Sequence, residues 1–151
     1  MITTKVGDGG KSWCGGKMVD KDGPLLEAMG SLDELQAGLM MVDEKKIVKD
    51  LKEIMGIIAS LSSSSSLSSC KVKDKVEWLE REIKKMDKGD VEEFLVFETK
   101  KAREFNLVRT VCRRAERRLV GYGKVGKVDK EILIYINRLS DYLFLKAVLN
   151  N

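Results

Sequence analysis

The residues best suited to chemistry in this chain form an arginine-rich block at residues 109–118, which reads RTVCRRAERR. Five arginines and one glutamate fall within this block, in a segment whose apolar spacing is typical of a helix. A helix turns about 100° per residue, and one face therefore gathers Arg109, Arg113, Glu116 and Arg117. Planar guanidinium groups donate paired hydrogen bonds to phosphate and carboxylate oxygens. The block predicts a binding face for an anionic ligand.

Two further rows share this helix. The apolar arc that we expect to face a core contains Phe105, Val108, Val111, Cys112, Ala115 and Leu119, and the third row contains Arg103, Arg114 and Arg118. Alternatively, the basic rows form a solvated surface with ion pairs such as Arg113–Glu116. Asp33 and Glu34, earlier in the chain, are candidate counter-charges, either within one subunit or across an interface.

A second set of chemically useful groups lies in the glycine-rich segment TTKVGDGGKS at residues 3–12. Clustered glycines expose backbone N–H groups that can hold phosphates, and Lys5 and Lys11 add positive charge. The segment lacks the GxxxxGK[ST] spacing of a Walker loop. A flexible tail is the alternative interpretation.

The third set is YINRLSDYLF at residues 135–144. The Asn137 amide offers donors and an acceptor, which suits a ribose or a base edge. A helix cap or an interhelical hydrogen bond is the alternative role.

Composition limits the chemistry. The chain has 151 residues, 43% of them hydrophobic, with one proline, which favours one all-α domain. It has no histidine, which excludes imidazole bases and histidine-ligated metals. Three widely spaced cysteines suggest neither a zinc site nor a redox pair. The net charge of +4 does not require nucleic acid, and we find no membrane-spanning run. We expect a soluble, cytoplasmic protein.

Five helices must position these groups, and each shows an apolar stripe with helical spacing. The expected ranges are 24–41, 44–61, 72–87, 99–122 and 129–149. Glycines at residues 1–23 predict a loop or a set of turns there. The serine tract 59–69 is either a helix end packed closely on a neighbour or a flexible loop. The sequence therefore predicts one domain over residues 1–151, with a glycine-rich loop at 1–23 and a helical bundle at 24–151.

Taken together, these segments resemble the PduO-type ATP:cob(I)alamin adenosyltransferases. The resemblance rests on TKVGDGGKS at 4–12, VDKDGPLLEAMGSLDELQ at 19–36, VRTVCRRAERR at 108–118 and YINRLSDYLF at 135–144. It implies a five-helix, ferritin-like bundle that forms a homotrimer with active sites between subunits. It also implies an enzyme that moves the 5′-deoxyadenosyl group of ATP, taken with Mg²⁺, to the cobalt of a Co(I) corrinoid.

The resemblance also implies roles for particular residues. The nucleotide loop would comprise Thr4, Lys5, Gly7, Asp8, Gly10, Lys11, Ser12 and Lys21. Arg109 and Arg113 would hold phosphates or the ribose, with Asp33 paired to Arg109 across the interface. Asn137 would contact the nucleoside, and Glu116 would either orient Arg113, which we favour, or hold the metal. Phe94 would displace the lower axial ligand of the corrinoid.

The chain departs from the family pattern at several positions. Val6 and Lys11 replace hydroxyl residues, Leu25 replaces Arg, Gln36 replaces Asn, and Asn106 stands where His is usual. The PGG that follows the aromatic run is absent, because residues 97–99 read FET. A non-catalytic homologue that binds ATP or corrinoid, as a carrier or regulator, is therefore a second hypothesis. A helical nucleic-acid-binding protein is a third. The resemblance adds a reductase or an adenosylcobalamin-dependent enzyme as further partners.

Overall fold

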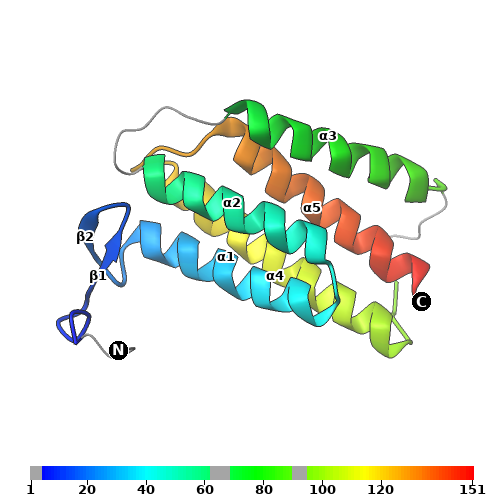
Figure 1. The fold of residues 1–151 in the computed structure, drawn as a ribbon. Helices are drawn as coiled ribbons and strands as arrows, with labels where there is room; N and C mark the ends of the chain where they lie inside the picture. Colours follow the sequence, from blue (N-terminus) through cyan, green and yellow to red (C-terminus); the bar gives the residue numbers. More distant parts are fainter. Residues whose placement is uncertain (1–4, 62–68, 90–94) are drawn as a thin grey trace.

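A computed structural model describes residues 5–61, 69–89 and 95–151 of the chain. In the described part, five helices lie side by side in a bundle, and a small hairpin stands where the first helix begins (Figure 1). The elements in chain order are β1 (Lys11–Cys14), β2 (Lys17–Asp20), α1 (Pro24–Met41), α2 (Lys45–Leu61), α3 (Ser69–Met86), α4 (Lys100–Tyr122) and α5 (Lys130–Leu149). The prediction of five helices is confirmed.

The helix boundaries follow local capping chemistry. Pro24 occupies the first turn of α1, where its missing N–H costs no hydrogen bond. The Thr99 hydroxyl accepts a hydrogen bond from the Ala102 N–H at 3.0 Å, and the Asp129 carboxylate accepts one from Glu131 at the same distance. These caps satisfy N–H groups that a helix leaves unpaired at its start. Serine tract residues 62–68 lie outside the described part of the chain.

The N-terminal segment corrects the strictly all-α prediction. Instead of turns alone, β1 and β2 form a two-stranded antiparallel sheet in which Lys11 pairs with Asp20 and Cys14 with Lys17. Gly15 and Gly16, between the strands, have φ angles of 57° and 76°. Two central residues with positive φ are what a tight type I′ hairpin turn requires, and glycine supplies them without steric cost. The fold is a helical bundle with an added hairpin.

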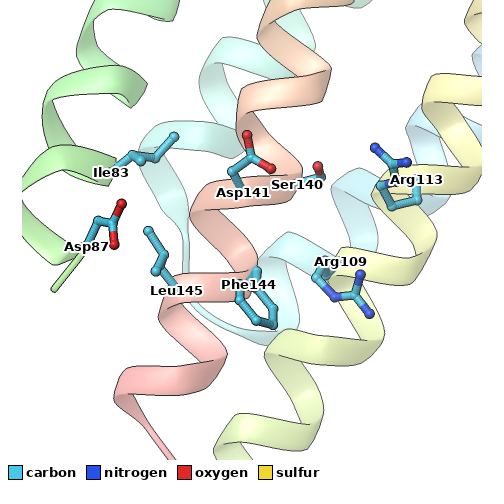
Figure 2. A pocket seen from close by; sticks show the side chains of 8 residues that line it. All are labelled: Ile83, Asp87, Arg109, Arg113, Ser140, Asp141, Phe144 and Leu145. Atoms are coloured by element: carbon cyan, nitrogen blue, oxygen red, sulfur yellow. The ribbon is translucent and has the colours of Figure 1, made fainter. Parts of the chain in front are cut away.

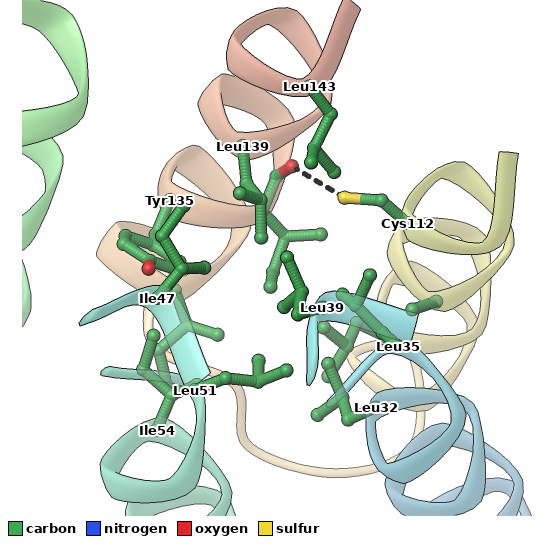
Figure 3. Packing of buried hydrophobic residues seen from close by; sticks show 14 of the residues in the cluster. Leu32, Leu35, Leu39, Ile47, Leu51, Ile54, Cys112, Tyr135, Leu139 and Leu143 are labelled. Atoms are coloured by element: carbon green, nitrogen blue, oxygen red, sulfur yellow. Dashed lines mark hydrogen bonds between the residues drawn. The ribbon is translucent and has the colours of Figure 1, made fainter. Parts of the chain in front are cut away.

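The core lies between the helices, with α4 packed against both α1 and α5, and with α5 also against α3. Large side chains that are fully buried include Leu32, Leu35, Leu39, Leu51, Leu119, Tyr135 and Ile136. Figure 3 shows part of this cluster, where the buried Cys112 thiol donates to the Ile136 carbonyl at 3.4 Å. Burial raises the pKa of this thiol. Cys112 therefore belongs to the packing between α4 and α5.

The turn after α4 requires glycine at position 126. A Cβ atom there would lie 2.3 Å from Cε2 of Tyr122, a ring that is 7% exposed. We expect Gly126→Ala to lower the free energy of unfolding by about 1 to 2 kcal/mol, because the ring or the turn must shift. Urea unfolding followed by circular dichroism measures the change.

Gly121→Ala is the matched control for that substitution. A Cβ at Gly121 meets no described atom within 4 Å, and alanine is the better helix former. We expect unchanged or slightly raised stability. Equal destabilisation by both substitutions would contradict the steric explanation for Gly126.

Candidate functional site

A cleft of about 530 Å³ lies between α3, α4 and α5. Its lining residues are Ile83, Asp87, Arg109, Arg113, Ser140, Asp141, Phe144 and Leu145. Figure 2 shows Arg109 and Arg113 of α4 on one side, the α5 side chains in the middle, and Ile83 of α3 with Asp87, just after that helix, on the other side. One wall is therefore cationic, the opposite wall carries the Asp87 carboxylate, and α5 supplies Asp141, Phe144 and Leu145 between them. This arrangement suits a ligand with both an anionic part and a large apolar part.

Arg113 is oriented by Glu116. Its Nη1 donates to Glu116 Oε2 at 2.9 Å, across one turn of α4. The other carboxylate oxygen of Glu116 accepts from Asn137 Nδ2 of α5 at 3.1 Å. Glu116 thus connects two other predicted site residues, Arg113 of α4 and Asn137 of α5. The Arg113–Glu116 ion pair, which was expected if the basic rows form a solvated surface, is present. The same contact would also orient Arg113.

The Asn137 amide has a defined direction. Its Oδ1 accepts from Arg138 Nη1 at 2.9 Å, and Arg138 Nε donates to Glu80 Oε1 of α3 at 3.1 Å. With Nδ2 bound to Glu116, the amide keeps one N–H and one lone pair for other partners. The interhelical hydrogen bond expected as an alternative role for Asn137 is present, and it leaves capacity for a ligand.

Arg109 is placed at the cleft by neutral groups. Its Nε donates to Asn106 Oδ1 at 2.9 Å, and its guanidinium carbon lies 6.0 Å from the centre of the Phe144 ring. In the described part of one chain, no ion pair joins Arg109 to Asp33. Asp33 is exposed on α1. The predicted pairing of these two residues across an interface stays a prediction.

The third basic row pairs with α1. Arg118 Nε lies 3.0 Å from Glu27 Oε2, and Arg114 forms an ion pair with Glu34. Glu34, expected as a counter-charge for the basic rows, therefore answers Arg114 and not the row that contains Arg109 and Arg113. All four side chains are at least 44% exposed, so these contacts hold α1 against α4 only weakly.

The glycine-rich segment folds back on itself before β1. Lys21 Nζ donates to the Gly7 carbonyl at 2.6 Å, and its backbone N–H donates to the Gly10 carbonyl at 2.9 Å. Lys11 lies 3.7 Å from Asp20 in an exposed ion pair. The structure thus brings together most of the predicted loop residues, namely Lys5, Gly7, Asp8, Gly10, Lys11, Ser12 and Lys21, whereas Thr4 lies outside the described residues.

This loop and the cleft are separated within one chain. Figure 1 shows the hairpin beside the start of α1, at one end of the bundle, whereas α3 and α5 end at the opposite end. The cleft contains Ile83 and Leu145, which lie near those two helix ends. A single chain therefore does not join the two sets of predicted nucleotide-binding residues into one site.

Sequence reasoning overlooked the aromatic part of the cleft. Phe144 stacks edge-on with Phe97, with ring centres 6.4 Å apart and planes at 83°. Phe144 lies seven residues after Asn137 in the same helix, so both residues share a face with Asp141. That spacing could have identified Phe144 as a residue that lines the cleft beside Asp141. Phe94, predicted to contact the corrinoid, lies outside the described residues.

The described residues contain no group of three or more histidine, cysteine, aspartate or glutamate side chains able to hold a metal ion. Within the same part of the chain, every helix is too short or too polar to cross a lipid bilayer. The fold and the site together define a helical-bundle protein with an arginine-lined cleft.

Comparisons with known proteins identify the family to which this bundle is similar. The model of the family described as cobalamin adenosyltransferase matches residues 2–149. The human corrinoid adenosyltransferase is 30% identical over 169 residues, covering 97% of this chain and 67% of the relative. A corrinoid adenosyltransferase of Salmonella typhimurium is 33% identical over 163 residues, covering 97% of this chain and 48% of the relative.

The solved structures that are similar to this chain are of the same kind of enzyme as these relatives. A variant of the PduO-type ATP:corrinoid adenosyltransferase of Lactobacillus reuteri, complexed with cobalamin and ATP, superposes with a TM-score of 0.81 at 27% identity. The alignment covers 99% of this chain and 91% of that one. A second variant of that protein, complexed with ATP, gives a TM-score of 0.79 at 26% identity, over 99% and 94% of the two chains. The chain belongs to the cobalamin adenosyltransferase family.

Proposed function

We propose that the chain transfers the 5′-deoxyadenosyl group of ATP to the cobalt of a Co(I) corrinoid, giving adenosylcobalamin and triphosphate. The observation that supports this most directly is the cleft, where the guanidinium groups of Arg109 and Arg113 stand beside the apolar floor around Phe144. ATP carries the anionic part and the corrinoid the large apolar part. Structures of a relative complexed with both molecules support the same pair of substrates.

The reaction suits a chain without histidine. The electron pair of Co(I) attacks the 5′ carbon of ATP, a Co–C bond forms, and the C–O bond to the triphosphate breaks with its electrons on oxygen. No proton is transferred in this step, so no general base is needed. The protein must align the two reactants and stabilise the departing triphosphate. Arg109 and Arg113 are the groups that we assign to that stabilisation.

The active site lies between subunits of a homotrimer. The separation of the glycine-rich loop from the cleft within one chain supports this arrangement, because the loop of one subunit can meet the cleft of another. Asp33 is exposed on α1, and Arg109 has no ion pair in the described part of its own chain. An interface that pairs these two charges would satisfy both.

The corrinoid lies against Phe144, Leu145 and Ile83 in the cleft. Two described residues that flank the segment 90–94 support a role for Phe94 there. Asp87 lines the cleft, and Phe97 packs on Phe144. Phe94 would then act at the lower face of the corrinoid, in place of its axial ligand.

Magnesium enters with the nucleotide. Mg²⁺ is commonly held by one or two carboxylates together with substrate phosphates. Glu116 already accepts from Arg113 and Asn137, which favours its orienting role. The exposed Asp8 of the loop is the carboxylate that we assign to the nucleotide-bound ion. The ion would partly neutralise the triphosphate.

The remaining assignments are part of the same proposal. The chain is a single ferritin-like domain over residues 1–151 that works in the cytoplasm. A reductase supplies the Co(I) state, and an adenosylcobalamin-dependent enzyme takes the product. Nucleic acid is not part of the proposal, because a net charge of +4 does not require it and aromatic residues make up only 6% of the chain.

The test is direct. Purified protein, ATP, Mg²⁺ and chemically reduced cobalamin under anaerobic conditions should give the absorption spectrum of adenosylcobalamin, with one triphosphate released per product. Tight ATP binding by calorimetry without product would select the carrier or regulator. Failure of both product formation and ATP binding would contradict the proposal altogether.

Asn137→Ala should separate nucleotide binding from assembly. We expect the Kd for ATP to rise about tenfold, because the remaining N–H of the amide no longer reaches the nucleoside. The trimer should persist, since the Asn137 contacts stay within one chain. Calorimetry and sedimentation velocity measure the two effects. An unchanged Kd would remove Asn137 from the nucleotide site.

A further inference from the structure

Among the described residues, the guanidinium of Arg109 has only neutral partners, as does that of Arg117, which donates to the Arg113 carbonyl at 3.2 Å. Of these two arginines, only Arg109 lines the cleft. Arg113, Arg114, Arg118 and Arg138 each form an ion pair with a glutamate. Arg109 instead donates through Nε to the amide oxygen of Asn106, 2.9 Å away, and lies over the Phe144 ring. No carboxylate among the described residues lies within 4.0 Å of it. Its positive charge is therefore uncompensated within the described part of the chain.

We infer that Asn106 is a positioning residue for Arg109, which orients the guanidinium at the cleft without neutralising it. The group is planar, so a hydrogen bond at Nε fixes the direction of the plane and leaves the four N–H bonds of the two Nη atoms available. Holding a long side chain in place also lowers the entropy lost when it binds an anion. An aspartate in this place would offer an acceptor in the same geometry but would neutralise the charge of Arg109.

The inference rests on the proposed function, in which Arg109 contacts the ATP phosphates or the carboxylate of a neighbouring subunit. It adds that the neutrality of residue 106 is itself required. Asn106 is half-buried one turn before Arg109 on α4, and it does not line the cleft. Its effect on substrates must therefore pass through Arg109.

Three substitutions separate orientation from charge. Asn106→Ala removes the acceptor and should weaken ATP binding about threefold to tenfold. Asn106→His keeps a neutral acceptor and should restore most of the affinity. Asn106→Asp keeps the acceptor but adds a negative charge, and should weaken ATP binding more than alanine does. The difference in ATP affinity between the aspartate and alanine variants should decrease at high salt, because salt screens the added charge.

Calorimetry with ATP and Mg²⁺ on the assembled protein gives these affinities, and thermal unfolding checks the fold. Thr110→Ala is the control, because the exposed Thr110 hydroxyl bonds only to the Leu107 carbonyl of its own helix. We expect no change there. If Asn106 had only a structural role, the alanine and aspartate variants would have lower melting temperatures. The aspartate variant would then not bind ATP more weakly than the alanine variant.

A double-mutant cycle provides the decisive comparison. In an Arg109→Ala background, Asn106→Ala should have no further effect on ATP affinity. An equal loss in both backgrounds would overturn the inference while leaving the proposed function intact. So would an aspartate variant that binds ATP as well as the original protein. If the unsubstituted protein bound no ATP, the proposed function would fail first, and the inference with it.

Discussion

Arg109→Ala should lower kcat/KM for adenosylation by about a hundredfold to a thousandfold. Removing one preorganised donor from a site where negative charge develops has effects of this size. The triphosphate gains charge as the C–O bond breaks, and the Arg109 guanidinium stands at the cleft with its fork unpaired in the described part of the chain. Anaerobic kinetics with varied ATP and corrinoid concentrations measures the loss.

The same substitution should also weaken the proposed trimer, because the proposed interfacial partner of Arg109 is Asp33 of another subunit. Sedimentation velocity over a range of protein concentrations separates the two effects. Activity that stays low at concentrations where the trimer persists assigns Arg109 to the reaction. Activity that recovers fully with assembly would contradict its role at the triphosphate.

Arg103→Ala is the matched control on the same helix. Arg103 is exposed and does not line the cleft, yet the substitution removes the same charge and side-chain length. We expect turnover and assembly to stay within twofold of the original protein, as is usual for exposed surface positions. A loss similar to that of Arg109→Ala would mean that net basicity, not position, sets activity.

The helices could be predicted because their causes are local. Apolar residues recur at helical spacing, and Pro24, Thr99 and Asp129 mark helix starts by their own chemistry. The hairpin was also signalled locally, by Gly15–Gly16 between short segments with alternating apolar residues. The density of glycines predicts a loop or a set of turns at residues 1–23 and does not indicate that the two strands pair.

The site was only partly predictable. Arg113 and Glu116 are three residues apart on one helix, so spacing alone places them in contact. The contact of Glu116 with Asn137 depends on how α4 packs against α5, which no local pattern specifies. Asp87 and Ile83 join the cleft only because α3 packs on α5. Any partner of Asp33 in another subunit lies beyond what one chain contains.

A buried ion cluster links α2 to α3, the helix that supplies one wall of the cleft. Lys75 Nζ lies 2.8 Å from Asp50 Oδ1 and 2.7 Å from Glu53 Oε2, and Lys46 lies 2.6 Å from Asp50 Oδ2. The Asp50 side chain is only 8% exposed, whereas that of Glu53 is 45% exposed. Lys75 itself is 13% exposed, so its ammonium has few water molecules to replace a lost carboxylate.

Asp50→Ala should therefore lower the free energy of unfolding by about 3 kcal/mol. The loss has two parts: broken hydrogen bonds to two lysines, and the cost of leaving the Lys75 charge largely desolvated with one partner. Glu53→Ala removes a carboxylate from the same lysine at an exposed position, and should cost less than about 1 kcal/mol. Urea unfolding of both variants at neutral pH provides the comparison.

The difference between these two variants tests burial as the cause. The pKa of Lys75 is raised by its two carboxylates despite the opposing effect of its own burial, and Lys75 pairing lowers the pKa of Glu53. Because the pKa of Glu53 is lowered in the folded protein, the contribution of its ion pair to stability is present at neutral pH and is lost as pH falls through that folded-state pKa. The stability gap between the original protein and Glu53→Ala should therefore narrow in acid. Equal losses for the two variants at neutral pH would show that the number of ion pairs, and not the burial of Asp50, determines how firmly α2 holds the wall of the cleft.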